Sequence, residues 1–318
     1  MIGRRKLLSS VTAAALVPSP GFSQQSASVK VGLTTLDGGG YALYAPALLD
    51  ALKFVDPLLQ LVVVPTNGTA DNAAMLATGD IDIGLVTGEV TNELLTAKVP
   101  EDEQVKVLSV MYSSPGLFAV RADSRFRRIA DLRGRPIVWS VKGSGVMVQA
   151  RYIAEGLGLD MERDFEPIYP EKFTQASGLV FDGRAAALWG TGARWPAFVE
   201  LANTPIGARF VAPDSREIQR ICAKFDFMAR MTVPAGLYIG QYDAIETVGT
   251  WSFILARGGL PDAIGLRLAS SLNKAERMGA MTKQLAQTTA KNTLSAVPSR
   301  DVLQPGVLEF YQKKGLIR

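Results

Sequence analysis

Residues 79–88 read Gly-Asp-Ile-Asp-Ile-Gly-Leu-Val-Thr-Gly, and residues 183–192 read Gly-Arg-Ala-Ala-Ala-Leu-Trp-Gly-Thr-Gly. Each stretch begins with a glycine that can end a helix, continues as an apolar strand and closes on Thr-Gly. The two stretches lie in different halves of the chain. This similarity between two parts of the chain is expected of a protein with two similar α/β lobes. Chance similarity is the alternative.

Strands and helices alternate around both stretches. In the first half, apolar and β-branched runs predict strands over residues 29–34, 61–64, 81–86 and 105–111, with helices over 41–54 and 70–78. In the second half we expect strands over 137–141 and 185–189 and a helix over 146–155. Alternation of this kind is typical of a mostly parallel sheet with helices on its faces, so the predicted class is α/β.

The first 23 residues have the features of an export signal. Basic residues at positions 4–6 precede an apolar run, Leu7–Val17, that is too short to span a bilayer. Small residues at Gly21 and Ser23 match the spacing of a signal-peptidase site. We expect cleavage near Ser23 and a periplasmic product. A buried N-terminal helix or a membrane anchor is the alternative, and the paired arginines leave the export route open.

Composition excludes several classes of function. The 318 residues include no His and a single cysteine, Cys222, which excludes imidazole-based catalysis, cysteine-cluster metal sites and an internal disulfide framework. Of the 34 basic residues three lie in the signal segment, which leaves 31 against 30 acidic residues. A nearly neutral mature chain lacks the basic field that nucleic-acid binding requires. No metal or cofactor is expected.

Several short motifs occur in a familiar order. They are Gly38-Gly39-Gly40-Tyr41, Pro65-Thr66-Asn67-Gly68, Leu76-Ala77-Thr78-Gly79-Asp80-Ile81-Asp82, Ala130-Asp131-Leu132-Arg133-Gly134, Gly143-Ser144-Gly145 and Pro234-Ala235-Gly236-Leu237-Tyr238. Together they resemble the TAXI family, whose members are periplasmic receptors of tripartite ATP-independent periplasmic (TRAP) transporters. The resemblance covers most of the mature chain.

The resemblance implies a periplasmic-binding-protein-like fold of type II, with two lobes around a cleft. The lobes would be residues 24–118 with 247–318, and residues 119–246, joined by hinge crossover strands near 117–121 and 247–256. It also implies a monomer that captures a small organic carboxylate and presents it to the permease subunits of a TRAP transporter, without catalysis.

Four loops are candidates for contact with such a ligand. They are Gly40-Tyr41, Thr66-Asn67-Gly68, Thr87-Gly88 and Gly143-Ser144-Gly145. Each follows a predicted strand and precedes a predicted helix, where free backbone N–H groups and the helix dipole favour anions. The alternative is that these loops are simply tight turns.

Two cations and two aromatic residues complete the candidate site. Lys142 and Arg194 lie beside predicted ligand loops and could pair with a carboxylate, or could be solvated on the rim. Trp189, next to Gly190, and Tyr41 could form walls of a pocket, although a tryptophan that ends an apolar strand is often a core residue.

The chain departs from the family pattern at three candidate loops. Gly40, Thr87-Gly88 and Val146 stand where relatives often carry more polar residues. A larger or less polar organic anion therefore becomes plausible. A binding protein of an ABC importer has the same fold and remains an alternative, as does a sensory receptor. An enzyme that uses Lys142, or the carboxylates of Asp80 and Asp82, remains a distant one.

Overall fold

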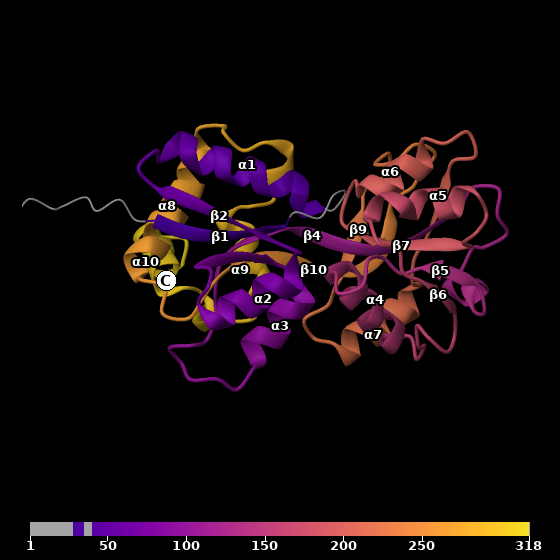
Figure 1. The fold of residues 1–318 in the computed structure, drawn as a ribbon, viewed down its shortest axis with the longest axis horizontal. Helices are drawn as coiled ribbons and strands as arrows, with labels where there is room; N and C mark the ends of the chain where they lie inside the picture. The colour runs from indigo at the N-terminus through magenta and orange to yellow at the C-terminus, as the bar shows by residue number, and fades with distance from the viewer. Residues whose placement is uncertain (1–27, 35–39, 318) are drawn as a thin grey trace, which may run out of the picture.

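The computed structural model describes residues 28–34 and 40–317. The predicted signal segment, residues 1–23, lies outside the described residues, as do Gly38 and Gly39. The described chain forms two lobes that are linked by two long strands (Figure 1). The strand order is β2-β1-β3-β10-β4-β7-β5-β6, with β8 paired to β4 and β9 paired to β10.

The first lobe is built on three parallel strands. Thr34 of β1 lies opposite Thr66 of β2, and Val31 lies opposite Ile83 of β3. Helix α1 covers one face of this sheet, and α2 and α3 cover the other (Figure 1). Its elements are β1 (Ser28–Thr34), α1 (Gly40–Val55), β2 (Gln60–Thr66), α2 (Thr69–Thr78), β3 (Ile83–Val86), α3 (Gly88–Thr96), α8 (Asp262–Arg277), η3 (Lys283–Leu285), α9 (Ala290–Ala296), η4 (Arg300–Val302) and α10 (Pro305–Lys313).

The second lobe repeats this arrangement with strands β5, β6 and β7. Pro136 of β5 lies opposite Glu166 of β6, and Ile137 lies opposite Ala187 of β7, in parallel pairs. Helices α4 and α7 lie on one face, and α5 and α6 on the other (Figure 1). Its elements are η1 (Ile129–Leu132), β5 (Pro136–Val138), α4 (Gly145–Gly156), β6 (Glu166–Ile168), η2 (Phe173–Gln175), α5 (Ala176–Phe181), β7 (Ala187–Thr191), α6 (Pro196–Ala202), β8 (Ala208–Val211), α7 (Ser215–Lys224) and β9 (Ala229–Val233).

Two antiparallel strands, β4 (Lys106–Arg121) and β10 (Ile245–Ala256), run through both lobes. The first part of β4 pairs with β10, and the part that begins at Gly116 pairs with β7 and β8. In the crossing region Ser114 faces Thr250. These strands are the only covalent links between the lobes within the described residues, which is the arrangement of a hinge.

The hydrophobic core is divided in the same way. One cluster of buried side chains uses residues from 29–111 and 253–317, and two further clusters use residues from 117–248. The change from one core to the other therefore falls inside β4 and β10. The C-terminal helices pack onto the first lobe, because β10 returns the chain there.

Candidate functional site

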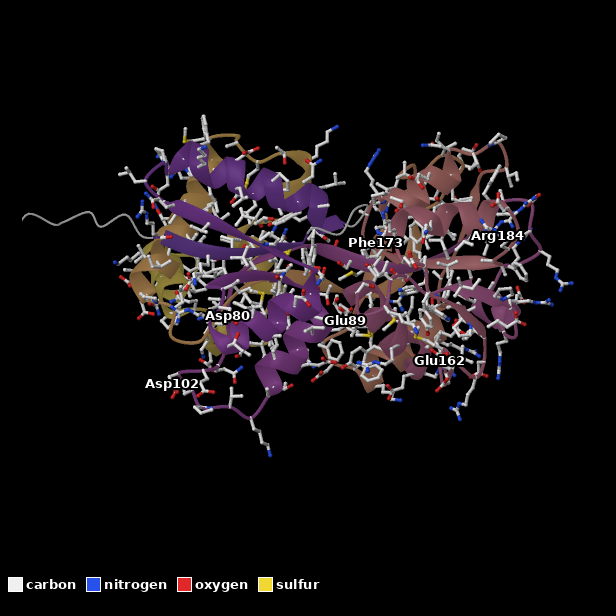
Figure 2. All side chains as sticks on the ribbon, in the orientation of Figure 1. Asp80, Glu89, Asp102, Glu162, Phe173 and Arg184 are labelled. Carbon is white, nitrogen blue, oxygen red and sulfur yellow. The ribbon has the colours of Figure 1, made fainter. Side chains whose placement is uncertain are left out.

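A cavity of about 370 Å³ lies between the two lobes. Its position follows from the topology, because parallel strands end at one edge of a sheet and ligands bind in the crevice beyond that edge. Figure 2 shows Phe173, one of its lining residues, at the junction of the lobes. The lining is Gly40, Tyr41, Leu43, Tyr44, Asn67, Gly68, Thr69, Thr87, Tyr112, Ser113, Ser114, Ser252, Lys283, Gln284 and Gln287 from the first lobe and Ser144, Gly145, Val146, Phe173, Thr191, Gly192, Ala193, Arg194, Trp195 and Pro196 from the second.

Helices of both lobes begin at this cavity, including α6, which starts at Pro196. Gly40 starts α1, Thr69 starts α2, Thr87 is the N-cap of α3 and Ser144 is the N-cap of α4. The Ser144 hydroxyl accepts a hydrogen bond from Met147 N–H at 3.3 Å and so completes the cap. The N–H groups of the next two residues, Gly145 and Val146, donate no hydrogen bond within the described residues. Free N–H groups and aligned helix dipoles make this a favourable place for an anion.

Aromatic rings line the cavity on both lobes. On the first lobe Tyr112 makes edge contacts with Tyr41, at a centroid distance of 6.4 Å, and with Tyr44, at 5.6 Å. On the second lobe Phe173 makes an edge contact with Trp195 at 6.1 Å. Such edge-to-face pairs stabilise one another and hold each ring in place.

The tyrosine hydroxyls differ in how they are bonded. Tyr41 Oη accepts a hydrogen bond from the Thr69 hydroxyl at 3.4 Å, and Tyr44 Oη lies 2.7 Å from the hydroxyl of Thr288. Tyr112 Oη has no hydrogen-bond partner within the described residues and lies beside Gly40, where α1 begins. Burial raises the pKa of Tyr112 well above its usual value, so this phenol remains a hydrogen-bond donor at physiological pH.

The charged side chains of the described lining are both cations. Arg194 follows β7 and Lys283 lies in η3, so each lobe contributes one positive charge at the exposed margin of the cavity. Arg194 has a φ of 58°, a left-handed conformation that is uncommon for a residue with a side chain. Strained backbone of this kind is often found where a side chain is held for binding.

One buried donor in the lining also lacks a partner. The indole N–H of Trp195, a residue only 4% exposed, makes no hydrogen bond within the described residues. This N–H is a donor only, and leaving it unpaired costs about 1–3 kcal/mol.

The lobes touch each other beneath the cavity. A Cβ on Gly145 of the second lobe would lie against the Thr87 methyl group, 2.8 Å from Thr87 Oγ1 and 3.1 Å from Thr69 Oγ1 of the first lobe. Exposed Glu93 of α3 accepts hydrogen bonds from Tyr152 at 2.6 Å and from Arg151 at 3.4 Å, both in α4. The structure therefore shows the lobes closed against each other on the side of α3 and α4.

A buried carboxyl group lies within this contact. Glu89 of α3 is 1% exposed, and its Oε1 accepts a hydrogen bond from Thr250 of β10 at 2.8 Å. Beside it, Gln149 of α4 donates to the backbone oxygen of Ser114 in β4 at 2.9 Å. Burial raises the pKa of Glu89, and the hydrogen bonds that it accepts offset only part of that effect. Figure 2 shows Glu89 where α3 meets the second lobe.

Many of the residues singled out in the sequence meet in this cavity. The structure brings together Gly40, Tyr41, Asn67, Gly68, Thr87, Ser144, Gly145 and Arg194. These residues come from loops that are far apart in the chain. Their contact with a ligand stays a prediction.

The other predicted residues, Thr66, Gly88, Lys142, Gly143, Trp189 and Gly190, lie outside the lining. Lys142 is exposed, and its Nζ lies 4.9 Å from the ring centroid of Tyr169. Trp189 is fully buried, and its indole N–H donates to Val146 O at 2.9 Å. The ring of Trp195 fills the space beside Gly190 and so separates it from the cavity. The cavity does not support a ligand role for these residues.

Gly88 and Thr66 lie just behind the lining. Gly88 packs so closely on Thr250 and on the backbone of Trp251 that a side chain would not fit. Thr66 is 4% exposed at the end of β2. Gly143 is exposed and has a φ of 76°, so its role in the structure is that of a turn.

The carboxylates considered for an enzyme also lie away from the cavity. Asp82 Oδ1 accepts a hydrogen bond from Arg257 Nε at 2.8 Å, and its Oδ2 accepts from Lys30 N–H at 2.9 Å. Asp80 accepts a hydrogen bond from Thr78 at 2.6 Å. Both carboxylates serve local structure in the first lobe.

Sequence patterns missed about two thirds of the lining. Tyr112–Ser114 and Ser252 lie on the crossing strands, and Lys283–Gln287 belong to the C-terminal segment. Thr191 and Gly192 stood within the repeated Thr-Gly layout and could have been chosen on that signal. No comparable signal marks Phe173 or Lys283.

Two further observations concern the described residues as a whole. They contain no cluster of three or more His, Cys, Asp or Glu side chains that could hold a metal ion. Among the helices described here, none has both the length and the apolar character needed to cross a membrane.

Comparison with solved structures concerns the fold. A protein of Bordetella bronchiseptica RB50 has a TM-score of 0.52 and 17% identity, over 91% of this chain and 81% of that chain. The GluR0 ligand-binding core from Nostoc punctiforme, in complex with L-glutamate, has a TM-score of 0.50 and 11% identity, over 80% and 96% of the two chains. Tv2483 bound to L-arginine has a TM-score of 0.50 and 9% identity, over 84% and 92%. The predicted α/β type II periplasmic-binding-protein fold is thereby confirmed.

Comparison with family models identifies the family. The match runs from residue 33 to residue 315 and so includes both lobes and both crossing strands. The protein belongs to the NMT1-like family and has the fold of type II solute-binding proteins.

Proposed function

We propose that this protein is an extracytoplasmic receptor that captures a small organic carboxylate between its lobes. The observation that carries the proposal is the meeting of helix N-termini from both lobes at one cavity, with the free N–H groups of Gly145 and Val146 among them. An anion placed there touches both lobes, so its binding free energy favours the closed arrangement over an open one.

The cations at the margin support the same proposal. Arg194 and Lys283 lie on opposite lobes, where their positive charge attracts an anion and raises its rate of entry. Neither forms an ion pair with a carboxylate among the described residues, so both are available to a ligand. Lys142, which is exposed and lies outside the lining, has no part in this proposal.

The resemblance to the TAXI family supports delivery of the ligand to a TRAP-type permease. The signal-like residues 1–23 support export to the periplasm, and the proposed receptor acts as a monomer. An ABC importer would use the same fold. Neighbouring genes distinguish the two systems, because a TRAP system encodes a multi-span permease without an ATPase and an ABC system encodes an ATPase with a Walker motif.

Native mass spectrometry of protein purified from its own host tests ligand capture. We expect a single small carboxylate bound to each mature chain, released on denaturation and identified from its mass. A neutral or cationic co-purifying molecule would contradict the proposal. So would a chain that binds none of a panel of carboxylates in calorimetric titrations.

Replacement of Arg194, at the margin of the cavity, by an uncharged residue tests the electrostatic contribution to ligand binding. Arg194→Met should weaken binding of the carboxylate by about 2- to 5-fold at low salt, with a smaller effect at high salt, because an exposed charge contributes about 0–1 kcal/mol. Lys142→Met is the matched control and should bind as tightly as the unchanged protein. Equal losses in both variants would show that general surface charge, and not Arg194, acts on the ligand.

A further inference from the structure

Five aromatic rings line the cavity, three on the first lobe and two on the second, and each lobe contributes a pair in edge-to-face contact. Tyr41 and Tyr112 meet edge to face on the first lobe, and Phe173 and Trp195 meet edge to face on the second. Each pair is carried by separate elements, α1 with β4 and η2 with the start of α6. Figure 2 shows Phe173 at the side of the second lobe that faces the first. The cavity is therefore bounded by aromatic surface on two sides.

The hydroxyl groups of the lining tyrosines differ in whether they are already hydrogen-bonded. The hydroxyls of Tyr41 and Tyr44 are already engaged by Thr69 and Thr288. No residue that the structure describes hydrogen-bonds to the hydroxyl of Tyr112, which lies at the start of α1. The remaining ring surface, with the side chains of Leu43, Val146 and Pro196, is apolar. Polar side chains lie at the helix N-termini and also on the crossing strands and in the C-terminal segment (Ser113, Ser114, Ser252, Gln284 and Gln287), whereas the ring surface is suited to an apolar body.

We infer that the ligand is an aryl carboxylate, with its ring between the two aromatic pairs and its carboxylate at the helix N-termini. This inference rests on the proposed function and adds the chemical class of the ligand's body. An arene fits because aromatic rings prefer edge-to-face contacts with other rings and lose little conformational freedom on binding. A cavity of about 370 Å³ falls in the range of sites for small organic molecules with apolar walls and a few placed polar groups.

A compact dicarboxylate matches the site less well. It offers no apolar surface to the rings of Phe173 and Trp195, both of which are at most 6% exposed, and its second carboxylate would have to lie against those rings or reach the marginal cations Arg194 and Lys283. A charge against buried apolar surface loses its hydration without gaining hydrogen bonds. The aromatic pairs would then contribute little to binding.

Titration with two matched probes tests the inference. Propionate and 3-phenylpropionate carry the same carboxylate and differ by one ring. We expect calorimetry to give at least about tenfold tighter binding of 3-phenylpropionate, because its ring is buried between the pairs. Equal binding of the two probes, or tighter binding of succinate, would overturn the inference and leave carboxylate capture intact.

A substitution at one lining ring tests whether the preference for 3-phenylpropionate arises in the cavity. Phe173→Leu keeps an apolar side chain of similar size, and we expect it to reduce the preference for 3-phenylpropionate over propionate by at least about threefold. Phe165→Leu is the matched control, because Phe165 is 5% exposed and meets Trp139 edge to face at 5.2 Å but does not line the cavity. Thermal melts check that both variants fold. An unchanged preference in Phe173→Leu, or an equal fall in Phe165→Leu, would overturn the assignment. Failure of every carboxylate to bind would refute both this inference and the proposed function.

Discussion

The Gly145→Val variant is expected to bind its ligand about 5- to 150-fold more weakly, because a side chain at this position holds the lobes apart. In the closed structure a Cβ on Gly145 meets Thr87 and Thr69 of the opposite lobe. Extra atoms in a packed contact cost about 1–3 kcal/mol, which corresponds to that loss of affinity. The same variant should have a larger radius of gyration than the unchanged protein when both are saturated with ligand, as measured by small-angle scattering.

Gly178→Val is the matched control for this prediction. Gly178 lies in α5 of the same lobe, and nothing lies within 4 Å of a Cβ added there. It should therefore close and bind normally, without loss of stability, because glycine is the less favourable residue in a helix. Normal affinity and normal closure in Gly145→Val would refute the view that this glycine is the point where the lobes meet.

The Glu89→Gln variant is expected to gain stability relative to the unchanged protein as the pH rises. Burial raises the pKa of Glu89 in the native protein, whereas in the unfolded chain the group titrates near its usual value of about 4.3. Between these two pKa values the native state holds a proton that the unfolded state has released. The free energy of unfolding of the unchanged protein then falls by about 1.4 kcal/mol per pH unit. Below the pKa of Glu89 in the unfolded chain, the contribution of this group to the free energy of unfolding does not change with pH. Above its pKa in the native protein, the free energy of unfolding falls no further on account of this group.

Other groups near Glu89 do not titrate in this window. Its charge acts on Tyr41 of α1 and on Tyr152 of α4, and burial is the main cause that raises the pKa of Tyr152 to about 12 and that of Tyr41 still higher. The other side chains that act on its carboxyl group, Thr250, Gln149 and Thr87, are neutral. The pH dependence can therefore be assigned to Glu89.

Urea unfolding at pH 5, 6, 7 and 8 measures this effect. Glu93→Gln is the control, because Glu93 lies on the same helix but its side chain is 44% exposed. The difference in unfolding free energy between Glu89→Gln and the unchanged protein should widen with pH, whereas Glu93→Gln should show no such trend. Parallel curves for Glu89→Gln and the unchanged protein would mean that the buried carboxyl group is not protonated in the native state.

The local sequence was sufficient to predict the class of fold and the loops that face the cavity. Alternating strands and helices predicted an α/β architecture, and the parallel strands β1, β2 and β3 are present. Ser144 and Gly145 could be found because a strand, a glycine-rich loop and a helix follow one another within a few residues. In such a unit the helix N-terminus lies at the carboxyl edge of the sheet, whatever the rest of the chain does.

The orientation of strand residues was harder to predict. Trp189 was a candidate wall of the pocket, but β7 is a central strand with helices on both faces, and Leu188 and Trp189 are both fully buried. Such a strand is apolar on both sides, so its sequence does not show which side chain faces a ligand. Lys142 was misplaced for a related reason, because the turn at Gly143 directs the chain and the lysine lies outside the cavity, over Tyr169.

The sequence by itself determined the α/β class and the glycine-rich helix starts, because each depends on residues that are neighbours in the chain, whereas the two-lobed organisation was expected from the family resemblance. Only the tertiary structure decided which distant segments complete the cavity. Gln287 accepts a hydrogen bond from Ser113 N–H at 2.8 Å across 174 positions of sequence, and this contact brings the C-terminal segment to β4. This contact forms because β10 carries the chain back to the first lobe. The pairing of β10 with β4 joins segments that are far apart in the sequence, so no local pattern predicts it.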